Sequence, residues 1–156
     1  MALFLVQHGI SASKDMDQER GLSELGTEET NRIAMVAKGY KISVQKIVHS
    51  GKKRAKQTAA IYHQALALET PMEKISGINP MDDVGNFASS IEPQENWMVV
   101  GHMPFMERLV SYLTTGSEDI LVYKFQNSGI VCLDVEGGVD KPADWFIKWT
   151  LNPNIS

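Results

Sequence analysis

The sequence predicts an α/β fold, a three-layer α/β/α sandwich whose sheet is mostly parallel and carries an antiparallel hairpin at one edge. Two observations lead to this prediction. Short, continuous apolar runs alternate with segments of helical periodicity, and such runs are typical of strands buried on both faces of a parallel sheet. The last third of the chain instead holds two β-rich segments in succession, which favours an antiparallel pair.

The first predicted strand is the apolar run Ala2–Val6, and a polar loop over 11–21 follows it. Ser23 is a suitable N-cap for the first helix because its hydroxyl can accept from a free backbone N–H. That helix should extend to about Lys38, with Gly39 as its C-terminal stop.

The second strand is expected over 44–49. Ser50 is placed to cap a second helix over 51–66, in which apolar residues recur at helical spacing. Further along, 72–75 suggests a short strand and 84–90 a short helix. The apolar run 97–101 predicts a central strand, and a helix follows it with Pro104 near its first turn.

The hairpin is predicted from the segments 130–135 and 145–151, joined by a turn at Gly137-Gly138. Alternation along the second segment places four large side chains on one face, namely Trp145, Ile147, Trp149 and Leu151. Ahead of this hairpin, 127–129 is expected to form a plain turn, with contact to the rim of the pocket as the alternative.

Length and composition limit the classes of protein to which this chain can belong. The 156 residues are expected to form one domain, 1–156, and the net charge of −4 argues against a nucleic-acid-binding surface. One cysteine excludes an internal disulfide and favours a reducing compartment. No apolar run is long enough to span a membrane. We therefore expect a cytoplasmic protein with no nucleic-acid or membrane partner.

Three polar segments follow predicted strands and should meet at one edge of the sheet, where sites form in parallel α/β folds. They are Gln7-His8-Gly9, the segment 50–54 and the segment 101–104. Lys52, Lys53 and Arg54 crowd the start of a helix, although the helix dipole disfavours cations there. A bound anion would relieve that repulsion, and phosphate suits both an arginine and free backbone N–H groups.

The same edge holds two histidines, His8 and His102, beside the expected phosphate site. A neutral imidazole can attack phosphorus to give a phosphohistidine, which water then hydrolyses. Its second nitrogen would be held by a hydrogen bond, commonly to a backbone carbonyl. A second histidine, kept protonated by the phosphate, can stabilise charge on the transferring group. Glycines beside both histidines would let the backbone approach the anion.

These residues, in this order, resemble the histidine phosphatase (phosphoglycerate mutase-like) superfamily, and more narrowly its SixA-type phosphohistidine phosphatases. Four segments match the motifs of the family in order and span most of the chain. Gln7-His8-Gly9 matches the family motif Arg-His-Gly, and Leu22-Ser23-Glu24-Leu25-Gly26 matches the family motif Leu-Thr-x-x-Gly. The segment 50–58 stands for Ser-x-x-x-Arg-Ala-x-x-Thr, and Gly101-His102-Met103-Pro104 for Gly/Ser-His-x-Pro.

The resemblance implies a phosphatase that needs no metal or other cofactor and acts on a phosphohistidine-bearing protein or a small phosphate ester. It implies that His8 is the nucleophile and that Arg54 and His102 complete the catalytic set. Arg20 matches an arginine at the pocket mouth of SixA-like members. Gln7, Gly9 and Met103 stand at the remaining phosphate-binding positions of these motifs.

One position departs from the family pattern, because Gln7 stands where the family has arginine. Glutamine keeps a donor but loses the charge and the two-pronged geometry, and one lost charge-assisted contact costs about 10²–10³ in rate. Lys52 or Lys53 could restore the charge. An alternative function is therefore a weakly catalytic module that binds phosphate or a phosphoprotein. A metal hydrolase is a third hypothesis, but the sequence has no His-x-His or His-Glu-x-x-His spacing.

Overall fold

The computed structural model describes residues 2–91, 95–136 and 143–155. Six strands form one sheet in the order β3-β2-β4-β1-β5-β6. The elements, in chain order, are β1 (Ala2–Gln7), α1 (Glu24–Gly39), β2 (Lys46–His49), α2 (Lys53–Ala65), β3 (Glu73–Lys74), α3 (Val84–Ser90), β4 (Trp97–Gly101), α4 (Phe105–Thr115), β5 (Ile130–Val135) and β6 (Trp145–Leu151).

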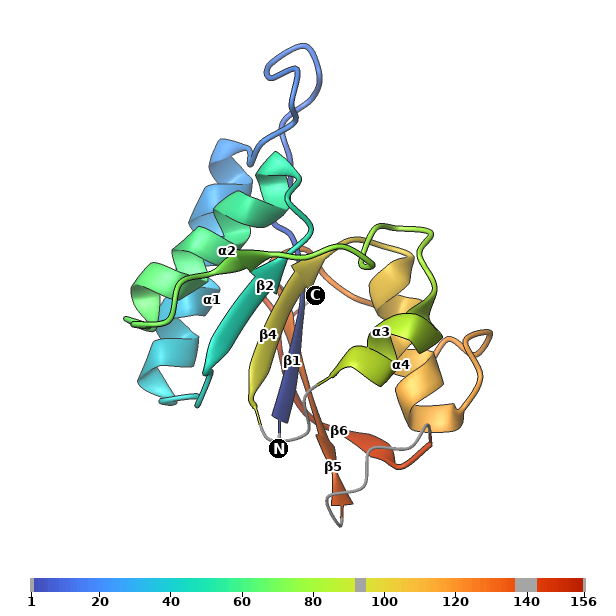
Figure 1. The fold of residues 1–156 in the computed structure, drawn as a ribbon. Coiled ribbons are helices and arrows are strands. Elements are labelled where there is room, and N and C mark those ends of the chain that lie inside the picture. The colour runs from blue at the N-terminus through green and yellow to red at the C-terminus, as the bar shows by residue number, and fades with distance from the viewer. Residues whose placement is uncertain (1, 92–94, 137–142, 156) are drawn as a thin grey trace.

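The pairing of the strands confirms the predicted fold class. β1, β2, β3 and β4 run parallel to one another, whereas β5 is antiparallel to β1 and β6 is antiparallel to β5. Helices α1 and α2 cover one face of the sheet, and α3 and α4 cover the other (Figure 1). The carboxyl ends of β1, β2 and β4 therefore point to the same edge, between the starts of α2 and α4.

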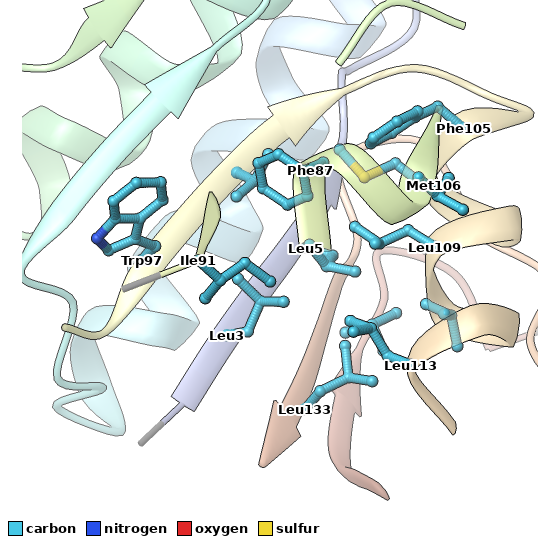
Figure 2. Close-up of a cluster of buried hydrophobic side chains, with 14 of the residues drawn as sticks. Leu3, Leu5, Phe87, Ile91, Trp97, Phe105, Met106, Leu109, Leu113 and Leu133 are labelled. Atoms are coloured by element: carbon cyan, nitrogen blue, oxygen red, sulfur yellow. The ribbon is translucent and has the colours of Figure 1, made fainter. Parts of the chain in front are cut away.

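Strand β1 shows why the sheet is buried on both faces. Leu3 and Leu5 pack among the side chains of α3 and α4, and Figure 2 shows this cluster. The alternate residues, Phe4 and Val6, pack among the side chains of α1 and α2. Because consecutive strand residues point to opposite faces, an unbroken apolar run satisfies both cores at once.

Two predicted helix boundaries are wrong. Gly39 lies within α1, and the residue that leaves the helix with a positive φ is Lys41 (φ 55°). Ser50 does not cap α2, because Gly51 has a φ of 89° and Lys52 occupies the N-cap position without a side-chain cap. The hydroxyl of Ser50 instead contacts His102, at the carboxyl edge of the sheet.

The face predicted for β6 is also wrong over half of the strand. Cys132 pairs with Trp149 and the next residue of β5, Leu133, pairs with Ile147, so one extra residue of β6 lies between these pairs. Such a bulge reverses which face of the sheet the following side chains occupy. Trp145 and Ile147 accordingly pack against the α3–α4 side, whereas Trp149 and Leu151 pack against the α1–α2 side.

Three other predicted elements differ from the observed ones in length. The predicted strands over 44–49 and 72–75 shorten to 46–49 and 73–74, and the first two predicted residues of the second helix, Gly51 and Lys52, precede α2. The expected turn at Gly137-Gly138 lies outside the described residues. Within the described part of the chain, no helix is long and apolar enough to cross a membrane.

Candidate active site

The three polar segments predicted to converge do so at the carboxyl edge of the sheet. The backbone N–H of His8 continues the pairing of β1 by donating to the carbonyl of Gly101, at 3.0 Å. This register brings the imidazole rings of His8 and His102 to a centroid separation of 5.0 Å. Arg54, on the first turn of α2, reaches the same place: its Nε lies 3.3 Å from Nε2 of His8.

Hydrogen bonds define the tautomer of His8. Its Nδ1 lies 2.7 Å from the carbonyl oxygen of Gly9, and a carbonyl can only accept, so Nδ1 carries the proton. Nε2 accepts from the Nε–H of Arg54 and therefore presents a lone pair toward the arginine. A nucleophilic imidazole needs such an unprotonated nitrogen, held in place by a bond to its partner nitrogen.

The surroundings of His8 also favour its neutral form. Burial lowers its pKa to about 4, and the positive charges of Arg54, Arg20 and Lys52 act in the same direction. The hydrogen bond to Gly9 opposes this shift only in part. His8 is therefore neutral at physiological pH, with its free nitrogen among cations.

His102 is almost fully buried, with 2% of its surface exposed. Its Nε2 lies 2.6 Å from the hydroxyl oxygen of Ser50, and its Nδ1 is buried without a hydrogen-bond partner among the described residues. Burial lowers the pKa of His102 to about 3, with the charges of His8, Arg54 and Lys52 contributing in the same direction. A protonated His102 thus requires an added negative charge in the site.

These pKa values predict a loss of stability in acid. In the unfolded chain the pKa of a histidine is near 6.5, whereas in the folded protein the pKa of His102 is about 3. Below pH 6.5 the unfolded chain therefore binds a proton at His102 that the folded protein does not bind, and this favours unfolding. The free energy of unfolding should fall by about 2 kcal/mol for His102 between pH 7 and pH 5. Urea unfolding of the wild type and of His102→Asn at both pH values measures this difference. Equal pH dependence in the two proteins would show that His102 is not held neutral by the fold.

Three residues that the sequence patterns did not assign to the site hold its backbone and its second histidine. The hydroxyl of Thr58 accepts from the N–H of Gly9 at 2.9 Å and donates to the carbonyl of Arg54 at 2.8 Å, so it joins two segments of the site. Asn127 donates from its side chain to the carbonyl of His8 at 2.9 Å. Ser50 contacts His102. For Thr58 the motif spacing is a usable signal, and for Asn127 the only signal is that the turn at 127–129 precedes a strand and could reach the rim of the pocket.

The loop after His8 is fixed against the start of α1. Ser23 caps α1 by accepting from the N–H of Gly26, and both its N–H and its hydroxyl donate to the carbonyl of Ile10. A Cβ on Gly26 would lie 2.0 Å from that same carbonyl oxygen. The Leu-Ser-x-x-Gly motif is therefore a support for the loop that follows His8.

The remaining predicted residues lie around this centre in different ways. Gln7 is the last residue of β1 and pairs with Gly101. The missing Cβ of Gly9 makes room for Thr30 and Leu22, so this glycine serves close packing. Arg20 is exposed, and its guanidinium donates hydrogen bonds to the Ser11 hydroxyl and the Ala12 carbonyl. Its positive charge adds to burial in lowering the pKa of both His8 and Arg54.

Met103 follows His102, and its partly buried side chain packs against the α3–α4 core. Its predicted phosphate contact stays a prediction. No group of three or more histidine, cysteine, aspartate or glutamate side chains within the described ranges could hold a metal ion. The centre of the site thus consists of two neutral imidazoles and one arginine, with further positive charges at its rim.

Comparisons with known proteins show which proteins this chain resembles in sequence and in fold. The chain is 25% identical to phosphohistidine phosphatase SixA of Escherichia coli (strain K12), over 98% of this chain and 94% of that protein. A solved structure of the protein histidine phosphatase SixA with tungstate is 26% identical, with a TM-score of 0.83 over 98% of this chain and 97% of the other.

A mycobacterial glucosyl-3-phosphoglycerate phosphatase shares the fold, with a TM-score of 0.70 at 15% identity, over 94% of this chain and 96% of the other. No protein-family model matches the sequence.

Proposed function

This chain belongs to the SixA type of the histidine phosphatase superfamily, and from that premise we propose that it hydrolyses phosphohistidine on a partner protein through a phosphohistidine intermediate on His8. The observation that supports this most directly is the hydrogen bonding of His8. Nδ1 is tied to the Gly9 carbonyl, and Nε2 presents its lone pair toward Arg54.

In the first step, the lone pair on Nε2 of His8 forms a bond to phosphorus as the bond from phosphorus to the leaving atom breaks. The leaving atom keeps the electron pair and takes up a proton. Arg54 holds the phosphoryl oxygens, and His102, protonated once the negative phosphoryl group is bound, stabilises the charge that develops on them.

In the second step, water attacks phosphorus and the bond between nitrogen and phosphorus breaks, which returns the electron pair to Nε2. Phosphate leaves, and His8 is neutral again. A pKa near 4 suits this cycle because the nucleophile is regenerated unprotonated at neutral pH. His8, Arg54 and His102 are the side chains to which this cycle assigns the bond-making step and the stabilisation of its charge.

A turnover assay tests this function. A protein phosphorylated on histidine and a small aryl phosphate are the two substrates, and released phosphate is measured for the wild type and for His8→Ala. We expect hydrolysis by the wild type only, with the phosphohistidine protein as the better substrate. Equal rates for the two proteins would rule out His8 as the nucleophile.

Replacement of Arg54 by lysine should lower kcat/KM by about 10²-fold, because lysine keeps the charge but loses the two-pronged contact to the phosphoryl oxygens. Most of the loss is expected in kcat, since the contact strengthens as charge develops. Steady-state kinetics with the aryl phosphate measure both parameters. An unchanged kcat would show that Arg54 does not contact the transferring group.

A second candidate function is a phosphoprotein-binding module with little turnover, and Gln7 at the end of β1 is the observation that favours it. The same assay separates the two functions. A binding module would retain a phosphohistidine protein at equilibrium, with an affinity that depends on Arg54, but would release no phosphate above the His8→Ala background.

A further inference from the structure

The loss of charge at Gln7 leaves a gap in the site that another cation could fill. A phosphoryl group carries close to two negative charges near neutral pH. Of the two arginines that the family places around it, this chain keeps Arg54 and has the uncharged Gln7 at the end of β1. Either the site binds the phosphoryl group weakly, or a positive charge reaches it from elsewhere.

Lys53 is not available for this purpose. Its Nζ lies 2.7 Å from a carboxylate oxygen of Asp17 and 3.9 Å from one of Glu19. The bond to Asp17 raises the pKa of Lys53, and the same carboxylate accepts from the N–H of Gly21. The charge of Lys53 is thus already neutralised, and its contact fixes the 11–21 loop to α2.

Lys52 lies differently, between the two residues of this segment that touch the histidines. Two residues after it, Arg54 donates to His8; two residues before it, Ser50 contacts His102. The backbone N–H of Lys52 itself faces the Ser50 hydroxyl, at 3.4 Å. Its side chain is exposed, and no carboxylate in the described ranges forms a salt bridge with it.

The two histidines both respond to the charge of Lys52. Burial is the largest cause of the lowered pKa of His8 and of His102, and the charge of Lys52 adds to the shift at both histidines. Arg20 also lowers the pKa of His8, but its guanidinium is bonded to loop oxygen atoms of Ser11 and Ala12. Among the described cations, Lys52 combines a side chain without a salt bridge with a place in the chain between Ser50, which contacts His102, and Arg54, which contacts His8.

We propose that Lys52 binds the phosphoryl group from the N-terminus of α2 and supplies the positive charge that Gln7 does not. This assignment rests on the proposed function, because it concerns the same oxyanion. The lysine side chain delivers a point charge on a flexible stem, so it can compensate for lost attraction but not for the directional contact of an arginine. Lys52 then determines affinity more than the alignment of the phosphoryl group.

The test measures tungstate binding by calorimetry, together with turnover of the aryl phosphate, for Lys52→Met. Loss of one charge-assisted contact should weaken tungstate binding by about 10- to 100-fold and raise KM more than it lowers kcat. Lys56→Met is the matched control, because Lys56 is an exposed lysine one turn further along α2. Since its charge acts on His49 and is not among the causes that shift the pKa of His8 or His102, its replacement should change the dissociation constant by less than about threefold.

A compensating variant makes the assignment specific. If Lys52 replaces the missing charge, Gln7→Arg should restore tungstate affinity in the Lys52→Met background by a larger factor than it improves the wild type. The proposal is wrong if Lys52→Met binds as the wild type does, if Lys56→Met loses as much, or if tungstate does not bind. Tungstate binding is measured independently of turnover. If tungstate binding depends on Lys52 but the wild type hydrolyses no substrate, the proposed function is wrong and the assignment of Lys52 stands.

Discussion

His8→Asn is expected to lower turnover of a phosphohistidine protein by on the order of 10⁴-fold or more, because removing the nucleophile removes the covalent route. Asparagine is chosen because it removes the nucleophilic nitrogen while keeping a side-chain N–H donor. Its amide can still donate to the Gly9 carbonyl, as Nδ1 does now, so the backbone of the loop should keep its position. What disappears is the lone pair on Nε2 that faces Arg54. Released phosphate, followed over several turnovers, measures the effect.

His63→Asn serves as the matched control for this substitution. His63 is a partly exposed histidine of α2 whose Nε2 lies 2.9 Å from the carbonyl of Thr70, away from the candidate site. It should retain turnover within about twofold, since surface substitutions away from special features change little. Comparable losses in the two variants would mean that the His8 effect comes from general damage to the fold.

Gly26→Ala should have the largest effect on stability. Its Cβ would lie 2.0 Å from the backbone oxygen of Ile10, and backbone cannot move aside as a flexible side chain can. Overpacking of this kind costs about 3 kcal/mol, and the higher helix propensity of alanine returns about 1 kcal/mol. We therefore expect a net loss of about 2 kcal/mol in urea unfolding, with reduced turnover because Ile10 follows the nucleophile segment.

Gly39→Ala is the control at the other end of the same helix. Gly39 is the last residue of α1 and has no positive φ, and a Cβ added there would have no neighbouring atom within 4 Å. Alanine at this position should stabilise the protein by up to about 1 kcal/mol. If Gly26→Ala were as stable as Gly39→Ala, the loop after His8 would not be packed tightly against α1.

Much of the fold follows from local sequence signals. The bounds of α3, β4, β5 and β6 agree with their predicted ranges, since each is a short segment with one dominant pattern. The bulge in β6 is not predictable in this way, because strict alternation along 145–151 conceals it. Only the pairing of Cys132 with Trp149 and of Leu133 with Ile147 shows the extra residue. Such a register shift depends on the partner strand, which the strand's own pattern does not describe.

The convergence of His8, Arg54 and His102 is predictable because strand ends define an edge in parallel folds. The supporting contacts are not. Asn127 lies 119 positions from the carbonyl that it binds, so no local pattern connects it to His8. Serine chemistry suits both a helix cap and a partner for imidazole, so the sequence alone does not distinguish these roles for Ser50. The backbone of Gly51, with its positive φ, separates Ser50 from α2 and decides between them.

The structure also explains the cations at the start of α2, which the helix dipole disfavours. Lys53 is neutralised by Asp17, and Arg54 is directed to His8. Of the three, Lys52 alone has neither such contact among the described residues, on a helix whose first N–H groups have no side-chain cap. The sequence pattern thus combines a proposed phosphate ligand, a loop anchor and the arginine of the site in three consecutive residues.

The covalent intermediate offers the decisive experiment on the role of His8. The wild type is mixed briefly with a protein labelled with ³²P on histidine, quenched in alkali, and digested for mass spectrometry. We predict label that is stable in base, labile in acid and located on the peptide that contains His8, with none in His8→Asn. Rapid hydrolysis by the wild type with no label on that peptide, or label on another residue, would contradict a covalent mechanism through His8.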